Sequence, residues 1–229
     1  LFAFKKLPEN FYIHYELFQF IKLRNIEVEK TQISSGEIKL QFQQQEKTYD
    51  LNVLLKTKKF LKFFGDKDIQ STGFVSNTGL LFDSFKLNDL KKPKKNIHVV
   101  YDRKKDKLKV EYKRKTTEKK YVGKLLDIPS LILQFHFEKT KPTYSFDFVE
   151  GKKIKNIKYK KIKDESITIK GKSYLTELYE GEISLAKNSK HFVWLSKGTY
   201  RVPIKIRLRM KGGLMIDQNL KTTDLKLKN

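Results

Sequence analysis

Cysteine is absent from the 229 residues of this sequence, and so are long apolar runs. Without cysteine the chain can form no disulfide framework, thiol nucleophile or zinc site with cysteine ligands. The longest apolar runs, such as residues 79–82 and 131–133, are much shorter than the about 18 residues that a transmembrane helix requires. We therefore expect no transmembrane segment in this sequence.

Arginine is scarce, because only six of the 50 basic residues are arginine and the others are lysine. The formal net charge is nevertheless +24, since only 26 residues are acidic. Lysine is a solvated point charge that suits open surfaces, whereas close phosphate binding often uses the planar fork of arginine. The lysine excess therefore has two interpretations, a lysine-rich soluble surface or an electrostatic footprint for a polyanion.

The position of the basic residues favours the second interpretation modestly. Residues 1–90 contain 13 basic and 11 acidic side chains, whereas residues 91–229 contain 37 and 15. Within the second part, residues 91–124 hold 15 cations and four anions, and residues 197–211 hold six cations and no anion. A uniform lysine bias would not produce this asymmetry.

The chain has enough apolar residues to fold, with 38% hydrophobic and 13% aromatic residues. No long linker rich in Pro, Ser or Gly separates two cores, and the best boundary candidate, residues 91–95, reads as an exposed loop between strands. We therefore predict a single β-rich domain over residues 1–229.

Alternation of apolar and polar residues predicts strands along most of the chain. The predicted strands are residues 11–17, 38–42, 51–55, 97–101, 108–112, 144–149, 154–162, 166–170, 174–179, 182–186, 191–195 and 201–210. Turn residues separate several of them, at 104–107, 150–152, 170–172 and 180–182. This pattern predicts an all-β fold, a single antiparallel curved sheet or partly open β-barrel.

One segment departs from the alternation and predicts a short helix at about 128–137. Asp127 can cap free backbone N–H groups, and Pro129 is tolerated in a first helical turn. Leu131, Ile132 and Phe135 then give an apolar stripe. We expect this helix to cover one end of the curved sheet, since open barrel mouths and sheet edges need covering.

The most informative strand is residues 201–210, where apolar and basic side chains alternate strictly. The basic face predicts an anion-binding strip formed by Arg201, Lys205, Arg207 and Arg209. Pro203, on the same face, indicates an edge strand, since proline donates no ladder hydrogen bond. The alternative is that this face is simply the solvated outer face of an edge strand.

Two aromatic residues are candidates for stacking on a sugar or a base. Trp194 is the only tryptophan and precedes the basic strand, although a lone tryptophan in a β-protein is more often a core residue. Tyr159 lies among four lysines at 155, 158, 160 and 161, which favours an exposed position on a basic face.

Catalytic patterns are weak, and we name no catalytic residue, metal ligand or cofactor. His14, His98, His136 and His191 form no close pair, and no phosphate-binding glycine loop or GxSxG motif is present. The carboxylates available to a glycosidase include Asp102, Asp106, Asp147 and Glu177, and their spacing in the sequence does not show whether they pair.

The sequence resembles the bacterial domain-of-unknown-function family 3108 in four elements that occur in the right order. These elements are residues 71–82 (STGFVSNTGLLF), residues 100–103 (VYDR), residues 127–131 (DIPSL), and residues 193–195 (VWL) together with 201–206 (RVPIKI). They cover roughly residues 70–210. The resemblance implies a secreted cell-envelope protein of Gram-negative bacteria, periplasmic or associated with the outer membrane, with a curved antiparallel sheet and no established activity. The first residue, Leu1, fits the expectation of a mature or truncated export product.

Three functions follow from these observations. The first is a non-enzymatic envelope protein whose basic face binds an anionic or amphiphilic ligand, such as lipid, lipopolysaccharide or acidic glycan, and it predicts an apolar cavity rimmed by the four cations of the strip. The second is a nucleic-acid-binding β-barrel, which predicts binding with a steep salt dependence. The third is a glycan-active envelope enzyme, which requires two carboxylates facing each other across a groove. The family resemblance favours the first.

Overall fold

A computed structural model describes residues 6–21, 33–58, 65–183, 189–210 and 214–227 of the chain. The first strands are β1 (Asn10–Ile21), β2 (Ile33–Gln45), β3 (Thr48–Thr57), β4 (Lys67–Ser76), β5 (Gly79–Asp89), β6 (Ile97–Asp102), β7 (Lys107–Tyr112) and β8 (Lys115–Lys120). The later strands are β9 (Leu125–Leu126), β10 (Thr143–Glu150), β11 (Lys153–Ile169), β12 (Lys172–Ile183), β13 (Lys190–Ser196), β14 (Pro203–Arg209) and β15 (Leu214–Thr223). Among the described residues, a 3-10 turn, η2 (Pro93–Lys95), and one helix, α1 (Ile128–Phe137), complete the elements.

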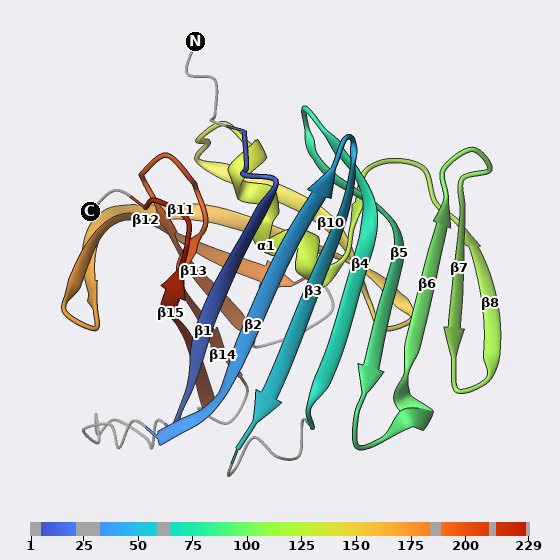
Figure 1. Ribbon diagram of the computed structural model, residues 1–229, viewed down its shortest axis with the longest axis horizontal. Helices are drawn as coiled ribbons and strands as arrows, with labels where there is room; N and C mark the ends of the chain where they lie inside the picture. Colours follow the sequence, from blue (N-terminus) through green and yellow to red (C-terminus); the bar gives the residue numbers. More distant parts are fainter. Residues whose placement is uncertain (1–5, 22–32, 59–64, 184–188, 211–213, 228–229) are drawn as a thin grey trace.

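All 15 strands of the described ranges belong to one sheet, in the order β8 to β1, then β15 down to β9. Neighbouring strands are antiparallel, except that the short β9 runs parallel to β10. The first and last strands of the chain, β1 and β15, therefore pair at the middle of the sheet. The sheet curves so that β9–β14 lie behind β1–β5 (Figure 1). The prediction of one curved, antiparallel, partly open barrel with a short helix is confirmed.

Helix α1 forms where the sequence predicts it and lies within the curve of the sheet (Figure 1). Asp127 and Ser130 form a capping box, in which the Asp127 carboxylate accepts from the Ser130 amide at 2.7 Å and the Ser130 hydroxyl accepts from the Asp127 amide at 3.0 Å. The helix contacts β3, β4 and β5 on one side and β10 on the other. It is therefore a central wedge that keeps the two halves of the sheet apart.

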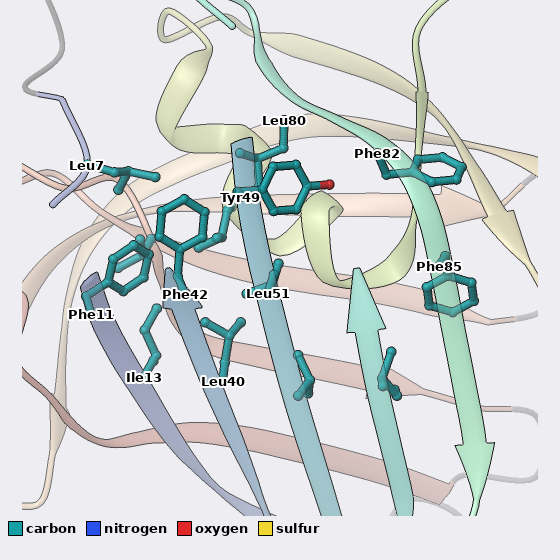
Figure 2. Close-up of a cluster of buried hydrophobic side chains, with 14 of the residues drawn as sticks. Leu7, Phe11, Ile13, Leu40, Phe42, Tyr49, Leu51, Leu80, Phe82 and Phe85 are labelled. Carbon is teal, nitrogen blue, oxygen red and sulfur yellow. The ribbon is translucent and has the colours of Figure 1, made fainter. Parts of the chain in front are cut away.

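The wedge divides the interior into two apolar clusters. The larger cluster lies on the concave side of β1–β7, and Figure 2 shows its aromatic and aliphatic side chains filling the space beside α1. Phe11 stacks on Phe42 with ring centroids 4.9 Å apart, and Phe42 stacks on Tyr49 at 6.1 Å. The smaller cluster joins the other face of α1, through Leu131 and Phe135, to β10–β14. The protein's own side chains thus occupy its interior.

The prediction from the sequence omits several strands and is wrong about one turn. Strands β4, β5, β8, β9 and β15 were not predicted, and the segments predicted at 154–162 and 166–170 form one long strand, β11 (Lys153–Ile169), with an irregularity between Lys161 and Lys163. The predicted turn at residues 180–182 lies inside β12, so segments 174–179 and 182–183 belong to one strand, and residues 184–186 lie outside the described residues. Gly181 is there for packing, because a Cβ at this position would come within 2.5 Å of the Tyr159 ring.

Across the described ranges, no helix is long and apolar enough to cross a membrane.

Candidate functional site

Arg201 is buried, so the prediction that it belongs to an exposed anion-binding strip is wrong. Its side chain is 4% exposed and donates to Glu177 Oε2 from Nε at 2.9 Å and from Nη2 at 2.7 Å. The same guanidinium donates to the hydroxyls of Tyr144 at 2.8 Å and Tyr179 at 3.0 Å. The guanidinium therefore has its full set of partners inside the protein.

The Arg201 network has a structural role at the end of α1. Arg201 Nη1 donates to the backbone carbonyls of Phe135 at 3.2 Å and Glu138 at 3.4 Å. The last carbonyls of a helix have no partner within the helix, and a cation there also complements the negative end of the helix dipole. Arg201 thus fastens the C-terminal end of α1 to β12 and β10.

Lys205 and Arg207 lie on the outer face of β14, where both pair with one carboxylate of the neighbouring strand. Lys205 Nζ lies 2.9 Å from Asp217 Oδ2, and Arg207 forms two hydrogen bonds with the same carboxylate at 2.6 and 2.7 Å. Burial acts to raise the pKa of Asp217, but the hydrogen bond from Arg207 and the charge of Lys205 outweigh it and leave the pKa below its usual value. The anion that pairs with these two cations is thus a side chain of the protein itself.

Strand β14 lies between β13 and β15, so the prediction of an edge strand is wrong. Pro203 is the first residue of β14 and pairs with Leu195 just after a register shift, a position that tolerates the missing N–H. Arg209, at the far end of the strand, is exposed and makes no ion pair with any residue that the structure describes. It is the one member of the predicted strip that stays both exposed and unpaired.

Trp194 lies on the outer face of the sheet beneath these cations. Lys205 Nζ lies 5.2 Å and the Arg207 guanidinium carbon 5.9 Å from the centroid of its ring, and the indole N–H donates to Glu165 at 2.8 Å. The indole is 8% exposed. The cations that were expected to accompany Trp194 around a ligand therefore cover its ring themselves.

Tyr159 lies inside the barrel, so its prediction as an exposed stacking residue is wrong. The ring is 2% exposed and packs edge-on against Phe135 of α1 at 5.1 Å. Its hydroxyl lies 2.9 Å from His191 Nδ1. Burial lowers the pKa of His191 to about 4, so the imidazole is neutral at pH 7 and can accept from the tyrosine.

Two clefts beside β10 do not match the apolar cavity that a ligand-enclosing barrel would need. Two clefts of about 410 and 760 Å³ border β10 and share residues 143–145. The smaller is lined by Lys124, Lys141, Glu138 and Asp147 among others, and the larger by two lysines and two glutamates of β11 and β12. Both linings are charge-balanced, and none of the four cations of the predicted strip takes part in them.

Three of the four carboxylates considered for catalysis, Glu177, Asp147 and Asp102, are held by the protein's own donors. Glu177 is bound to Arg201 and Lys161 inside the protein. Asp147 accepts from Tyr121 at 2.9 Å and from Asn156 at 2.7 Å. Asp102 is the last residue of β6, and Asp106 lies in the turn that leads to β7. The Asp102 carboxylate accepts from two backbone amides of this turn. Within the described ranges, no group of three histidine or acidic side chains converges as a metal site.

A different basic surface lies at the end of the sheet that carries the β5–β6 and β7–β8 connections. It comprises seven exposed cations, which we call the basic rim: Lys91, Lys92, Lys94, Lys95, Lys113, Arg114 and Lys115. The two connections lie at the same end because Ile97, the first residue of β6, pairs with Tyr112, the last residue of β7 (Figure 1). None of the seven side chains makes an ion pair with a carboxylate of the described residues.

Asp89 gives the rim loop a defined shape. Its carboxylate accepts from the backbone amides of Lys91 at 3.1 Å and Lys92 at 2.8 Å and pairs with Lys67 at 2.5 Å. Burial acts to raise the pKa of Asp89, but these hydrogen bonds outweigh it and lower the pKa below its usual value. The Asp89 amide in turn donates to the Asn96 side chain at 2.9 Å, which closes the loop. The four lysines of the loop are therefore displayed on a fixed turn.

The sequence matches the family described as "Protein of unknown function (DUF3108)" over residues 15–219. The chain belongs to this family. The match is wider than residues 70–210, where the four sequence elements place the resemblance, and it includes the N-terminal strands. No curated protein matches the chain.

A solved structure supports the fold of this DUF3108 chain. It is the crystal structure of a β-barrel-like protein of the domain of unknown function DUF1849 from Brucella abortus. The two chains are 12% identical with a TM-score of 0.59, over 94% of this chain and 97% of that one. At this identity the likeness concerns the fold alone.

The sequence of the DUF3108 chain carries a signal for the rim. Residues 91–124 hold 15 cations and four anions, the largest local excess identified in the chain. The pairing of β6 with β7 then selects from this segment the two connections that meet at one end. The strict alternation in residues 201–210 is the more conspicuous pattern. Strand β15, which carries the Asp217 partner of Lys205 and Arg207, is not predicted from the sequence.

Proposed function

We propose that this chain is a non-enzymatic protein of the bacterial cell envelope, periplasmic or associated with the outer membrane, that binds an anionic or amphiphilic ligand such as lipid, lipopolysaccharide or acidic glycan through the basic rim. The observation that carries this proposal is the concentration of seven exposed cations, none in an ion pair with a described carboxylate, at one end of the described sheet. Such a concentration attracts polyanions over a distance of about one Debye length, about 8 to 10 Å in physiological salt.

The contrast with the strip on β14 supports the rim as the contact surface. Lys205 and Arg207 share one buried carboxylate and stack on Trp194, so a ligand would have to compete with Asp217 for them. Lys94 and Lys113 face no such competitor among the described residues. An anion therefore gains more from the rim, where no internal ion pair has to break.

The packed interior also favours an external binding surface. Phe42, Phe82 and Phe85 are fully buried in the larger cluster, and α1 fills the space between the two halves of the sheet. An amphiphile bound inside would have to displace these side chains. Binding at the rim leaves the core intact, and the family resemblance, which implies an exported protein, supports an envelope ligand.

Binding of polyanions to the purified protein tests this proposal. Dextran sulfate, lipopolysaccharide and a short DNA duplex are titrated from about 50 to 200 mM salt, with uncharged dextran as the blank. We expect binding of dextran sulfate and lipopolysaccharide that weakens steadily with salt. Tighter binding of the duplex than of lipopolysaccharide would favour the nucleic-acid-binding alternative.

A pair of charge-matched variants locates the contact. The rim variant carries glutamate in place of Lys91, Lys92, Lys94 and Lys95. The control variant carries glutamate in place of Lys139, Lys158, Lys160 and Lys172, four exposed lysines away from the rim that also form no ion pair with the described residues and give the same change in net charge. We expect the rim variant to lose at least about tenfold more affinity than the control. Equal losses would show that general charge, and not the rim, attracts the ligand.

A further inference from the structure

Leu90 is an exposed apolar residue that directly precedes the first lysine of the basic rim. Its side chain is 55% exposed, and exposed lysines at 91 and 92 follow it directly. Pro93, the next residue, is exposed as well. A soluble polyanion gains nothing from an exposed leucine, whereas a lipid surface gains from burying it among the acyl chains.

Backbone hydrogen bonds on both sides of Leu90 fix the shape of the loop. The Leu90 amide donates to the Asp66 carbonyl at 3.0 Å, which ties the loop to the connection before β4. On the other side, the Asn96 amide donates to the Pro93 carbonyl at 3.0 Å and closes the 3-10 turn. Because the loop has this internal support, inserting Leu90 into a membrane requires no ordering of the chain at the moment of binding.

The neighbouring hairpin extends the surface in a chemically similar way. Lys113 and Arg114 have φ angles of 51° and 61°, the left-handed conformation of a tight hairpin turn between β7 and β8. The Lys113 ammonium lies 5.3 Å from the centroid of the Tyr112 ring. A tyrosine beside lysines is typical of residues at the level of lipid headgroups. The rim thus combines clustered cations, an exposed leucine and an adjacent tyrosine.

From this combination we infer that the basic rim docks the protein on the surface of an anionic phospholipid bilayer, with Leu90 inserted below the headgroups and the seven cations at the level of the phosphates. This inference rests on the proposed function and narrows its ligand to a lipid surface. Each cation close to an anionic bilayer adds attraction, and the leucine adds an apolar contribution that salt does not screen. Neither contribution requires an internal cavity.

The test measures binding to vesicles of phosphatidylcholine with about one third phosphatidylglycerol, compared with pure phosphatidylcholine vesicles and soluble dextran sulfate. The decisive variant is Leu90→Ser, which changes no charge. Its matched control is Leu175→Ser on β12, where the leucine is 49% exposed. We expect Leu90→Ser to weaken binding to the anionic vesicles by about tenfold and to leave dextran sulfate binding unchanged. Leu175→Ser should change neither.

A second measurement reads the position of the residue directly. The Leu90→Trp variant is mixed with anionic vesicles that contain brominated acyl chains, with the wild-type Trp194 fluorescence as the background. The wild-type indole is 8% exposed, so bromine should quench only the indole introduced at position 90. Absence of additional quenching in vesicle-bound protein would overturn the insertion of residue 90.

The outcomes separate this inference from the proposed function. Binding to dextran sulfate or lipopolysaccharide without binding to anionic vesicles would overturn docking on a bilayer and leave the proposed function standing. If the lysine-to-glutamate rim variant loses vesicle binding but Leu90→Ser retains it, the surface attracts lipids by charge alone and insertion is wrong. If neither polyanions nor vesicles bind, both the inference and the proposed function fail.

Discussion

Arg201 and Glu177 form a buried ion pair in which Oε2 of the carboxylate accepts two hydrogen bonds from the guanidinium, at 2.7 and 2.9 Å, while each side chain is only 4% exposed. Removing one partner leaves the other charged and buried. We therefore expect Arg201→Met to lower the free energy of unfolding by about 3 to 5 kcal/mol. Urea unfolding followed by far-UV circular dichroism measures this change.

A double substitution separates the pair from general loss of packing. Arg201→Met combined with Glu177→Leu removes both charges, so the double variant should be more stable than the sum of the two single losses predicts. Strict additivity would show that the two side chains act independently. Because Arg201 also binds Phe135 O and Glu138 O, the double variant should still be less stable than the wild type.

Gly181 offers a prediction about packing between β11 and β12. A Cβ at this position would lie 2.5 Å from Cε1 of Tyr159, whose ring is buried against α1. We expect Gly181→Ala to cost about 1 to 3 kcal/mol, because the tyrosine must shift within a packed core. The control is Gly171→Asn, at a turn position with φ +77° and no atom within 4 Å, where asparagine tolerates the left-handed conformation. Thermal unfolding should show a loss for the first variant and little change for the second.

Asp217 decides whether the cations of β14 are available to a ligand. With Asp217→Asn, Lys205 and Arg207 lose their counter-charge but remain on the outer face. In the background of the rim charge reversal, this substitution should restore measurable, salt-sensitive binding of dextran sulfate. Binding that stays absent would indicate that the stacking of both cations on Trp194 still occupies them.

The sequence was sufficient for the fold class, because alternation and the capping signal at Asp127 are local properties. It was not sufficient for the position of Arg201. Arg201 precedes β14, and a register shift lies between Trp194 and Leu195 on the facing strand, so the alternation of the strand does not extend to residue 201. Burial there depends on Glu177, which is 24 residues away in the sequence.

Tyr159 and Arg207 illustrate two further limits. For Tyr159, two signals in the sequence disagree. The alternation with Lys158 and Lys160 indicates an inward tyrosine, whereas the number of nearby lysines indicates an exposed one, and the alternation is correct. For Arg207, the carboxylate partner Asp217 lies on β15, whose sequence LMIDQNLKTT shows no clean alternation of apolar and polar residues. Register between strands depends on the whole sheet, so an ion pair across strands cannot be derived from one strand alone.

A substitution at Asp89 separates two effects on vesicle binding, the shape of the rim loop and the net charge, because it changes them in opposite directions. Asp89→Asn makes the protein more positive by one charge, which by itself would strengthen attraction to anionic vesicles. It also weakens the acceptor of the Lys91 and Lys92 amides and breaks the pair with Lys67. We expect weaker vesicle binding despite the added charge, since the loop must then be ordered on binding. Stronger binding, measured by vesicle sedimentation, would show that charge alone matters.

The pair of Tyr159 and His191 predicts a pH dependence of stability. The pKa of His191 is about 4 in the folded protein, because burial disfavours the charged imidazolium, whereas an unfolded histidine has a pKa near 6.5. Between these values the unfolded state binds more protons, so stability is fully present above about pH 6.5 and decreases as the pH falls toward 4. The expected loss between about pH 6.5 and 5 is roughly 1 to 2 kcal/mol.

His191→Gln should remove most of this dependence, because glutamine does not titrate. His14→Gln is the matched control, since burial also lowers the pKa of His14 while its hydrogen bond to Glu37 opposes that shift. The two are compared by urea unfolding above pH 5, where the ion-paired carboxylates Asp89 and Asp217 stay ionised because their pKa values lie below the usual range. A profile for His191→Gln as steep as that of the wild type would mean that the neutral imidazole beside Tyr159 is not the group that loses stability in acid.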